Sequence, residues 1–542
     1  MRTTLGAQIS HFLKDRGVDV IFGIPGVHNQ ELYRGIEEAG ITHVLARHEQ
    51  GAGFMADGYA RATGMPGVAY VISGPGLTNI MTPMGQAYSD SVPMLVISSC
   101  LDETAATRGQ LHQMKDQRAA AEAVCDWSEE ARTAEAAYAL IDRALAELHS
   151  QRARPKHIQV PIAQLESAAE EFERWGLGES WKNADKFEVR KIPAPIKSQS
   201  FASFEDSIAQ RLMQAERPLF VFGGGAAFAG QKLVSSVLDK TRSASFVTYA
   251  GRGVVPLDNP LSFGSNLARP DSAKLLEASD CVVFVGTDMA EVDLWRTRPG
   301  HRPGTIWVNT DTEVLARAHP QDTCLESDAG DVLSRIDMAL TGTPKSGWSS
   351  DIIAGYRDRW RAEIDAQRPG IVPVIDALRA ALPDDTMIYS DMTQFAYCSK
   401  EIWDMPHPRH WHHPTGFGTL GYALPAGIGG AVARRGQPTA VIAGDYGFQY
   451  TMQELGTAVE LSLALPVILW DNGKLKEIED SMVHAQIAPN AVIARNPDFC
   501  RLASAFGAAA VRPTSLDDIG PAVSEALGAH VPTLIHLTPD IL

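Results

Sequence analysis

Two oxygen-bearing side chains, Asp445 and Asn472, stand at the ends of two apolar segments of the chain. Asp445 follows residues 439–443, a predicted strand; a predicted helix comes next, and a second predicted strand ends at Asn472. The separation of about 27 residues is the length of one strand–helix–strand crossover. In a parallel sheet both strand ends open on the same edge, so the two side chains can converge on one cation. A carboxylate, an amide oxygen and a backbone carbonyl suit Mg²⁺ or Ca²⁺, with phosphate oxygens completing the shell.

The helix expected to open near Gly447 directs unpaired backbone N–H groups at the same place, where they can hold phosphate. Residues 444–472 therefore predict a diphosphate–metal site. For this motif alone the alternative is an ordinary crossover, with Asp445 as a helix cap and Asn472 in a turn. The spacing resembles the diphosphate-binding signature of thiamine diphosphate enzymes. That resemblance implies two sets of contacts: Gly444, Asp445, Tyr446, Gly447 and Asn472 for the cofactor, and Asp445, Asn472 and Lys474 for the metal.

One residue of this motif departs from the family pattern. The family has Gly-Asp-Gly where this chain has Gly444-Asp445-Tyr446, with Gly447 following. A tyrosine side chain must then find room near the diphosphate. Because Asp445 and Asn472 keep their spacing, we expect cofactor binding to survive.

A second motif lies about 400 residues upstream. Residues 47–61, RHEQGAGFMADGYAR, follow a short apolar segment and resemble the cofactor-activating segment of the acetolactate synthase branch. The resemblance implies that Glu49 faces the aminopyrimidine ring of thiamine diphosphate. A carboxyl group in an apolar interface has a raised pKa and can share a proton with a ring nitrogen, which promotes the tautomer that forms the ylid. The alternative is that Glu49 is a helix-cap carboxylate.

Further segments resemble the same family, among them residues 22–32, 73–79 and 87–99, together with the glycine-rich stretch 415–432. In relatives the carbonyl at the position of Gly418 accepts from the cofactor's amino group. A bulky apolar side chain at the position of Leu420, commonly Met in acetolactate synthases, bends the cofactor. The resemblance also assigns these residues to cofactor binding: Pro25, Ser73, Asn79 and Gln394.

The polar residues near the expected substrate position differ from those of two known branches. Pyruvate decarboxylases have Asp after the Gly-x-Pro-Gly turn and a His-His pair; here Val27 and His28 follow the turn, and a single His112 appears. Acetolactate synthases have Gln-Glu, whereas Gln113 is followed by Met114. The pyruvate decarboxylase proton machinery is therefore not carried over, and His28, His112 and Gln113 stay as candidate catalytic residues.

The acidic run Glu477, Glu479 and Asp480 is the main indication of substrate specificity. Its ordinary interpretation is a solvated helix start favoured by the helix dipole. The alternative is that one acid, Glu477 first, is catalytic or receives a cationic substrate tail, most naturally a guanidinium. The whole pattern resembles most the branch of 5-guanidino-2-oxopentanoate decarboxylases, which implies decarboxylation of that 2-oxo acid to 4-guanidinobutanal and CO₂. An acetolactate synthase-type carboligase is the alternative. A third hypothesis is a cofactor-free regulatory relative, but the retained Glu49 argues against it.

Strand–helix alternation predicts an α/β fold with three doubly wound parallel-sheet domains. We expect a pyrimidine-binding domain at residues 1–165, a central domain at 200–342 and a diphosphate-binding domain at 365–540, with linkers at about 166–200 and 342–350. Glu49 and Asp445 fall in different domains. By resemblance the site then forms between two subunits, which implies a homodimer and allows a tetramer.

A glycine run in the central domain raises the question of a second cofactor. Gly223, Gly224 and Gly225 follow an apolar segment but do not complete a G-x-G-x-x-G dinucleotide motif. At residues 263–280 the sequence differs from the Gly-Met-His-Gly-like motif of flavin-binding relatives. Bound FAD is therefore not expected.

Composition limits the remaining classes. The 542 residues include 48 basic and 65 acidic ones, a net charge of −17, which argues against nucleic acid or an anionic membrane as partner. No apolar run reaches transmembrane length, and the first residues predict an amphipathic helix and not a signal peptide. Six cysteines lack metal-type or disulfide-type spacing: Cys100, Cys125, Cys281, Cys324, Cys398 and Cys500. We expect a cytoplasmic enzyme with a small-molecule 2-oxo acid as substrate.

Overall fold

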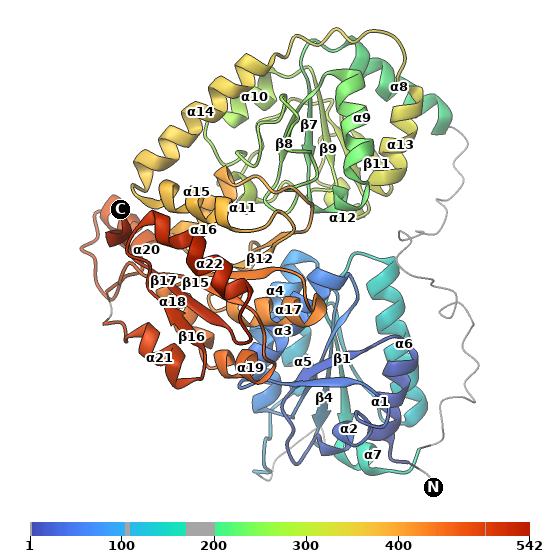
Figure 1. Ribbon diagram of the computed structural model, residues 1–542. Coiled ribbons are helices and arrows are strands. Elements are labelled where there is room, and N and C mark those ends of the chain that lie inside the picture. The colour runs from blue at the N-terminus through green and yellow to red at the C-terminus, as the bar shows by residue number, and fades with distance from the viewer. Residues whose placement is uncertain (1–2, 103–108, 170–200, 494) are drawn as a thin grey trace.

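The computed structural model describes residues 3–102, 109–169, 201–493 and 495–542, and it contains three sheets, each flanked by helices (Figure 1). All strand pairs within the three sheets are parallel. The predicted fold class, three doubly wound α/β domains, is confirmed. Most of the first predicted linker, residues 170–200, lies outside the described residues.

The N-terminal sheet has the order β2-β1-β3-β4-β6-β5. Its strands are β1 Val20–Gly23, β2 Thr42–Leu45, β3 Gly67–Val71, β4 Met94–Cys100, β5 Trp127–Glu130 and β6 Lys156–Pro161. The helices around it are α1 Leu5–Asp15, α2 Gln30–Arg34, α3 Glu49–Thr63, α4 Pro75–Asp90, α5 Gln117–Glu122, α6 Ala134–Ser150 and α7 Ile162–Glu166.

The C-terminal sheet repeats this strand order, as β13-β12-β14-β15-β17-β16. Its strands are β12 Met387–Ser390, β13 Trp411–His412, β14 Thr439–Gly444, β15 Pro466–Trp470, β16 Ala509–Val511 and β17 Thr533–Leu537. Its helices are α15 Ile371–Ala381, α16 Gln394–Ile402, α17 Ala423–Ala433, α18 Asp445–Thr451, α19 Glu454–Glu460, α20 Lys476–His484, α21 Phe499–Ala505 and α22 Ile519–Leu527. Every residue of β14 and β15 is buried, as expected of parallel strands covered on both faces.

The central sheet has the order β11-β10-β9-β7-β8. Its strands are β7 Pro218–Phe222, β8 Ala244–Val247, β9 Cys281–Val285, β10 Ile306–Asn309 and β11 Thr323–Glu326. Its helices are α8 Phe201–Gln214, α9 Gln231–Thr241, α10 Ser272–Ala278, α11 Glu291–Leu294, α12 Thr312–Leu315, α13 Ala329–Ala339 and α14 Ser350–Gln367. Helix α14 packs Ile353 and Trp360 into the core of this domain beside Phe246 and Phe263, and leads toward the C-terminal domain (Figure 1).

The N-terminal and C-terminal domains meet mainly through α3 and α17 (Figure 1). Glycines allow the two helices to approach closely: a Cβ at Gly58 would lie 1.9 Å from the carbonyl oxygen of Ala426, and one at Gly429 1.9 Å from that of Met55. Helix α3 begins where the His48 side chain accepts from the N–H of Gln50 and ends at Gly64, whose φ is 76°. The close contact therefore fixes α3, and with it Glu49, relative to the C-terminal sheet.

Among the described residues, no helix has the length and apolar character needed to cross a membrane.

Candidate active site

The predicted metal site lies where β14 and β15 end. The two strands are paired in register with Gly444 opposite Trp470, so Asp445 and Asp471 are neighbours at the carboxyl edge and Asn472 follows. The Nδ2 group of Asn496 donates to Asp445 Oδ2 at 2.6 Å and to Asp471 Oδ1 at 2.8 Å. The two carboxylates are thus held close together by one amide. Asn496 was not found from the sequence, because it lies in a loop with no strand or motif to mark it.

The donor set at this edge fits a hard divalent cation. Burial, with the nearby charge of Asp471, raises the pKa of Asp445 to about 6. At Asp471 burial is outweighed by hydrogen bonds with His536, at 2.9 Å, and with Asn496, which lower its pKa. The excess negative charge is what a bound cation relieves. Asn472 Oδ1 accepts from the N–H of Lys474, and the Lys474 ammonium pairs with Glu479 at 3.1 Å, so Lys474 can offer only its backbone carbonyl. Among the described residues, no group of three His, Cys, Asp or Glu forms an alternative metal centre.

A buried carboxylate links the diphosphate edge to the predicted pyrimidine loop. Asp391, which follows β12, accepts from the N–H groups of Met392 at 2.8 Å and Gly421 at 2.9 Å, and burial raises its pKa to about 6. A Cβ at Gly447 would lie 2.6 Å from Asp391 Oδ2, so glycine is needed at the start of α18. Asp391 therefore fixes the end of the segment that contains Gly418 and Leu420. It was missed from the sequence, although its place after an apolar strand was a usable signal.

The remaining cofactor residues of this half surround the same edge. Gly444 is buried at the end of β14, while Tyr446 is half-buried in the first turn of α18. Gly418 has a φ of 68°, a conformation that favours glycine, and its N–H donates to the carbonyl of Pro414 at 3.1 Å. Leu420 is half-buried. These backbone and side-chain positions fit a diphosphate and a ring held by main-chain groups.

Glu49 is the first residue of α3, at the carboxyl edge of the N-terminal sheet. Its Oε2 accepts from Asn79 Nδ2 at 2.9 Å, and its other oxygen lies 3.4 Å from where a Cβ on Gly76 would be. Asn79, predicted to bind the cofactor, therefore orients the Glu49 carboxylate in this chain.

The same edge collects three more predicted residues. His28 Nδ1 and the buried Ser73 hydroxyl are hydrogen-bonded at 2.7 Å, and the rings of His28 and His112 lie edge to face with centroids 4.9 Å apart. Burial and the neighbouring His112 lower the pKa of His28. Pro25 is exposed beside this group, whereas Gln113 accepts from the N–H of Gln110 at 3.0 Å in the loop that carries His112. The structure thus brings together His28, Ser73 and His112.

Within one chain, Glu49 and the pyrimidine loop lie at opposite ends of two helices. The C-terminal end of α3 carries Arg61, whose guanidinium lies 5.5 Å from the ring centre of Tyr422, next to α17. Glu49 precedes Arg61 by twelve positions, about 18 Å along an α-helix. Helix α4 gives the same result, because Asn79 contacts Glu49 while Asp90 Oδ1 accepts from the N–H of Gly416 at 2.8 Å.

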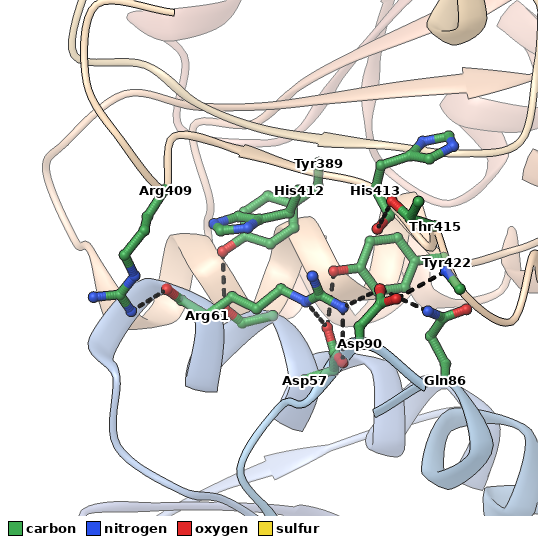
Figure 2. A network of polar contacts seen from close by, with 12 residues as sticks. Asp57, Arg61, Gln86, Asp90, Tyr389, Arg409, His412, His413, Thr415 and Tyr422 are labelled. Atoms are coloured by element: carbon green, nitrogen blue, oxygen red, sulfur yellow. Dashed lines mark hydrogen bonds and ion pairs between the residues drawn. The ribbon is translucent and has the colours of Figure 1, made fainter. Parts of the chain in front are cut away.

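Figure 2 shows this far end, where polar residues of α3 and α4 meet the C-terminal domain. Arg61 lies between Asp57, at 2.6 Å, and Asp90, at 2.7 Å, and the Tyr422 hydroxyl donates to Asp57 at 2.8 Å. Protein groups therefore fill the contact between the loop and the N-terminal domain of the same chain.

The predicted substrate residues gather on α20. Gln394 Nε2 donates to Glu477 Oε2 at 2.9 Å and to Asp480 Oδ2 at 3.3 Å. The Arg368 guanidinium, from the end of α14, pairs with Glu477 at 2.8 Å. Glu477 therefore lies beside a predicted cofactor residue, but it already has a cationic partner.

The carboxyl edge of the central sheet is occupied by groups of the protein. Arg152, from the N-terminal domain, pairs with Asp288 at 2.7 Å and with Asp311 at 2.5 Å. A Cβ at Gly223 would lie 2.2 Å from the carbonyl oxygen of Gly286, so this glycine serves close packing of two turns.

Comparison with known proteins agrees with this geometry. Three family models match in order: the N-terminal TPP binding domain of thiamine pyrophosphate enzymes at residues 3–120, their central domain at 206–336 and their C-terminal TPP binding domain at 391–537. The chain belongs to the thiamine pyrophosphate enzyme family and is a thiamine diphosphate-dependent 2-oxo acid decarboxylase or carboligase.

Individual relatives cover nearly the whole chain. It is 40% identical to the "Probable 2-ketoarginine decarboxylase AruI" of Pseudomonas aeruginosa, over 98% of this chain and 94% of the relative. It is 26% identical to the large subunits of acetolactate synthase isozymes 1 and 2 of Escherichia coli, over 99% of this chain and 94% and 96% of theirs.

Proposed function

We propose that the protein decarboxylates a 2-oxo acid with a cationic tail, with 5-guanidino-2-oxopentanoate as substrate and 4-guanidinobutanal and CO₂ as products, using thiamine diphosphate and Mg²⁺. The observation that carries the proposal is the position of Glu477 beside Gln394, where a carboxylate holds a guanidinium at 2.8 Å. The 40% identical relative is named for 2-ketoarginine, the same 2-oxo acid.

Each part of the chain has a role in this proposal. When bound, thiamine diphosphate would supply a carbon nucleophile for the 2-oxo group and an electron sink for the decarboxylation. Asp445, Asn472 and the carbonyl of Lys474 would hold the metal, and Gly418 and Leu420 would hold the ring of the cofactor. Glu49 exchanges a proton with the ring, and His28 and His112 lie at the same edge to move the proton that the aldehyde product takes up.

We also propose that each site forms between two copies of the chain. The two half-sites of one chain are separated by the lengths of α3 and α4, and each is rimmed by exposed apolar side chains. Val27 and Leu111 are 62% exposed near His28, and Ile478, Val483 and Ile487 are exposed on or just after α20. A second copy would cover these groups and bring Glu49 to the loop of its partner. A pair of such pairs is compatible with a tetramer.

Flavin has no part in the proposal, because Gly223, Gly224 and Gly225 do not complete a dinucleotide motif.

The test is incubation of the purified protein with thiamine diphosphate, Mg²⁺ and a panel of 2-oxo acids, with CO₂ and product mass followed together. We expect 5-guanidino-2-oxopentanoate to give CO₂ and the aldehyde at a higher kcat/KM than pyruvate. Preferred use of pyruvate with a hydroxyketone product would instead identify a carboligase of the acetolactate synthase type.

A further inference from the structure

Each acid in the acidic run of α20 has a basic partner, but the partners differ in kind. Glu479 pairs with Lys474 and Lys476, and Asp480 pairs with Lys476 one helical turn earlier. These partners are lysines of the same short segment. Glu477 alone in this run is paired with an arginine, and Arg368 comes from another element, the C-terminal end of α14.

The surroundings of Arg368 amount to a receptor for a guanidinium. Its Nη2 and Nε donate to the two oxygens of Glu477 at 2.8 and 3.4 Å, the two-point geometry that a planar fork provides. The ring centre of Tyr397 lies 5.9 Å from the guanidinium carbon. Gln394 Nε2 donates to Oε2 of the same Glu477 carboxylate at 2.9 Å. The Arg368 side chain is 17% exposed and that of Glu477 44%, so the pair is reached by solvent through Glu477.

We propose that Arg368 is a specificity-determining residue: an internal guanidinium that occupies the Glu477 carboxylate and is exchanged for the guanidinium tail of the substrate. This inference rests on the proposed function and concerns the same site. A guanidinium tail has the same hydrogen-bond donors as Arg368. Both oxygens of Glu477 therefore accept from a guanidinium before and after the exchange. The released Arg368 head can turn to water, because its long apolar stem allows the charge to move while the stem stays packed.

The exchange predicts an order among substrates. A tail ending in an ammonium is a point charge and cannot reproduce the two-point contact, so it displaces Arg368 less well. A neutral tail leaves the Arg368–Glu477 pair intact and gains nothing from Glu477. Arg368 thus lowers the affinity of the site for every cationic tail, but it lowers the affinity for a guanidinium tail less than that for an ammonium tail.

The experiment compares Arg368→Gln with Lys476→Gln in the complete protein loaded with thiamine diphosphate and Mg²⁺. Both variants remove one positive charge that is paired with an acid of α20, so Lys476→Gln controls for long-range charge. We expect Arg368→Gln to lower KM for 5-guanidino-2-oxopentanoate by about fivefold or more, and Lys476→Gln to change it by less than about twofold. KM for an uncharged 2-oxo acid should stay unchanged in both. Arg368→Lys keeps the positive charge but lacks the planar guanidinium, so its KM for 5-guanidino-2-oxopentanoate should lie between those of the wild type and Arg368→Gln.

A binding measurement separates this inference from the proposed function. 4-Guanidinobutanoate, which has no 2-oxo group, is titrated calorimetrically into the same variants, with hexanoate as the neutral counterpart. Tighter binding of the guanidino compound to Arg368→Gln alone supports the exchange, even if the wild type turns over no cationic 2-oxo acid and the proposed function falls. Weaker binding, no change, or an equal gain for hexanoate overturns it, because Arg368 then only fixes α20 in place.

Discussion

Asp445 and Asp471 lie side by side at the ends of adjacent strands and share one amide group, with Asn496 Nδ2 at 2.6 Å from the first and 2.8 Å from the second. In the part of the chain that the structure describes, Asp471 also forms a hydrogen bond with the His536 ring, at 2.9 Å. Asp445 thus keeps negative charge available for a ligand, while Asp471 is held by its neighbours. The two carboxylates have different expected roles, which mutagenesis can separate.

Asp445→Ala should weaken thiamine diphosphate binding in a Mg²⁺-dependent way, because a ligand of the bridging cation is lost. We expect a rise in the cofactor Kd of about tenfold to a hundredfold, by analogy with the loss of metal-site residues. Cofactor binding is followed by fluorescence quenching at several Mg²⁺ concentrations. Asn472→Ala should behave in the same way, and chelation by EDTA should release cofactor from the wild type. If Asp471→Asn were as harmful as Asp445→Ala, the assignment of the ligands would be wrong.

Glu49→Gln should leave the fold and the cofactor affinity unchanged but lower kcat by about 10²–10⁴, the range for loss of a general acid–base group. Steady-state kinetics and a cofactor titration on the same sample check both parts. Asn79→Ala leaves the carboxylate in place but removes its 2.9 Å hydrogen bond, so a smaller loss is expected. Near-normal turnover in Glu49→Gln would mean that Glu49 is not the group that exchanges a proton with the ring.

Subunit mixing tests whether each site draws Glu49 and Asp445 from different chains. Glu49→Gln and Asp445→Ala should each be inactive alone. After mixing and subunit exchange, a hybrid dimer has one intact site and one doubly altered site, so about a quarter of wild-type activity should return. No recovery, in a mixture shown by mass spectrometry to contain hybrids, would place both residues of a working site on one chain.

A structural feature could be predicted from the sequence when residues close together in the chain determine it, and could not when it depends on residues far apart in the chain. Strands, helices and the position of Asp445 and Asn472 at strand ends follow from local apolar patterns, and the parallel fold follows from their alternation. The shared strand order of the first and last domains has no counterpart in a sequence repeat. It depends on which strands pair across intervening helices, and local patterns leave that open.

Long-range partners were the residues that the sequence did not reveal. The acidic run on α20 was visible as charge, but its pairing with Arg368 joins residues 109 positions apart. Asn496 likewise reaches Asp445 from 51 positions away. A charged or amide side chain carries no local sign of its partner, so sequence alone suggested an available carboxylate where the structure has an occupied one.

Glu454 predicts a pH dependence of stability. This fully buried carboxylate accepts from the N–H groups of Arg47 and His48 at 3.0 Å, beside Glu49, and burial raises its pKa to about 7. The folded protein then holds a proton that the unfolded chain loses above its ordinary pKa of about 4.5. The stabilisation is complete below pH 4.5 and is lost as pH rises through about 7, a change on the order of 3 kcal/mol.

Thermal unfolding between pH 5 and 8 measures this effect. The Tm of the wild type should fall over that interval more than that of Glu454→Gln, in which this site no longer titrates. Parallel curves for the two proteins would show that the hydrogen bonds from the start of α3 keep Glu454 ionised throughout.

The network at the far end of α3 predicts a large loss of stability from a single change. Asp57→Asn leaves the Arg61 side chain, which is 14% exposed, with Asp90 as its only close carboxylate among the described residues, and it weakens the contact with Tyr422 across the two domains. Breaking a buried ion pair from one side costs about 3–5 kcal/mol. Tyr422→Phe removes only a hydroxyl donor and should cost about 1 kcal/mol.

Arg118→Ala is the matched control, because the Arg118–Glu122 pair is 41% and 53% exposed and should contribute at most about 1 kcal/mol. We measure the unfolding midpoint in guanidinium chloride for all three variants at one protein concentration. The midpoints give the order of their losses in stability. A midpoint for Asp57→Asn equal to that of Arg118→Ala would mean that Asp90 alone neutralises Arg61 and that the domain contact depends on the close packing of α3 and α17.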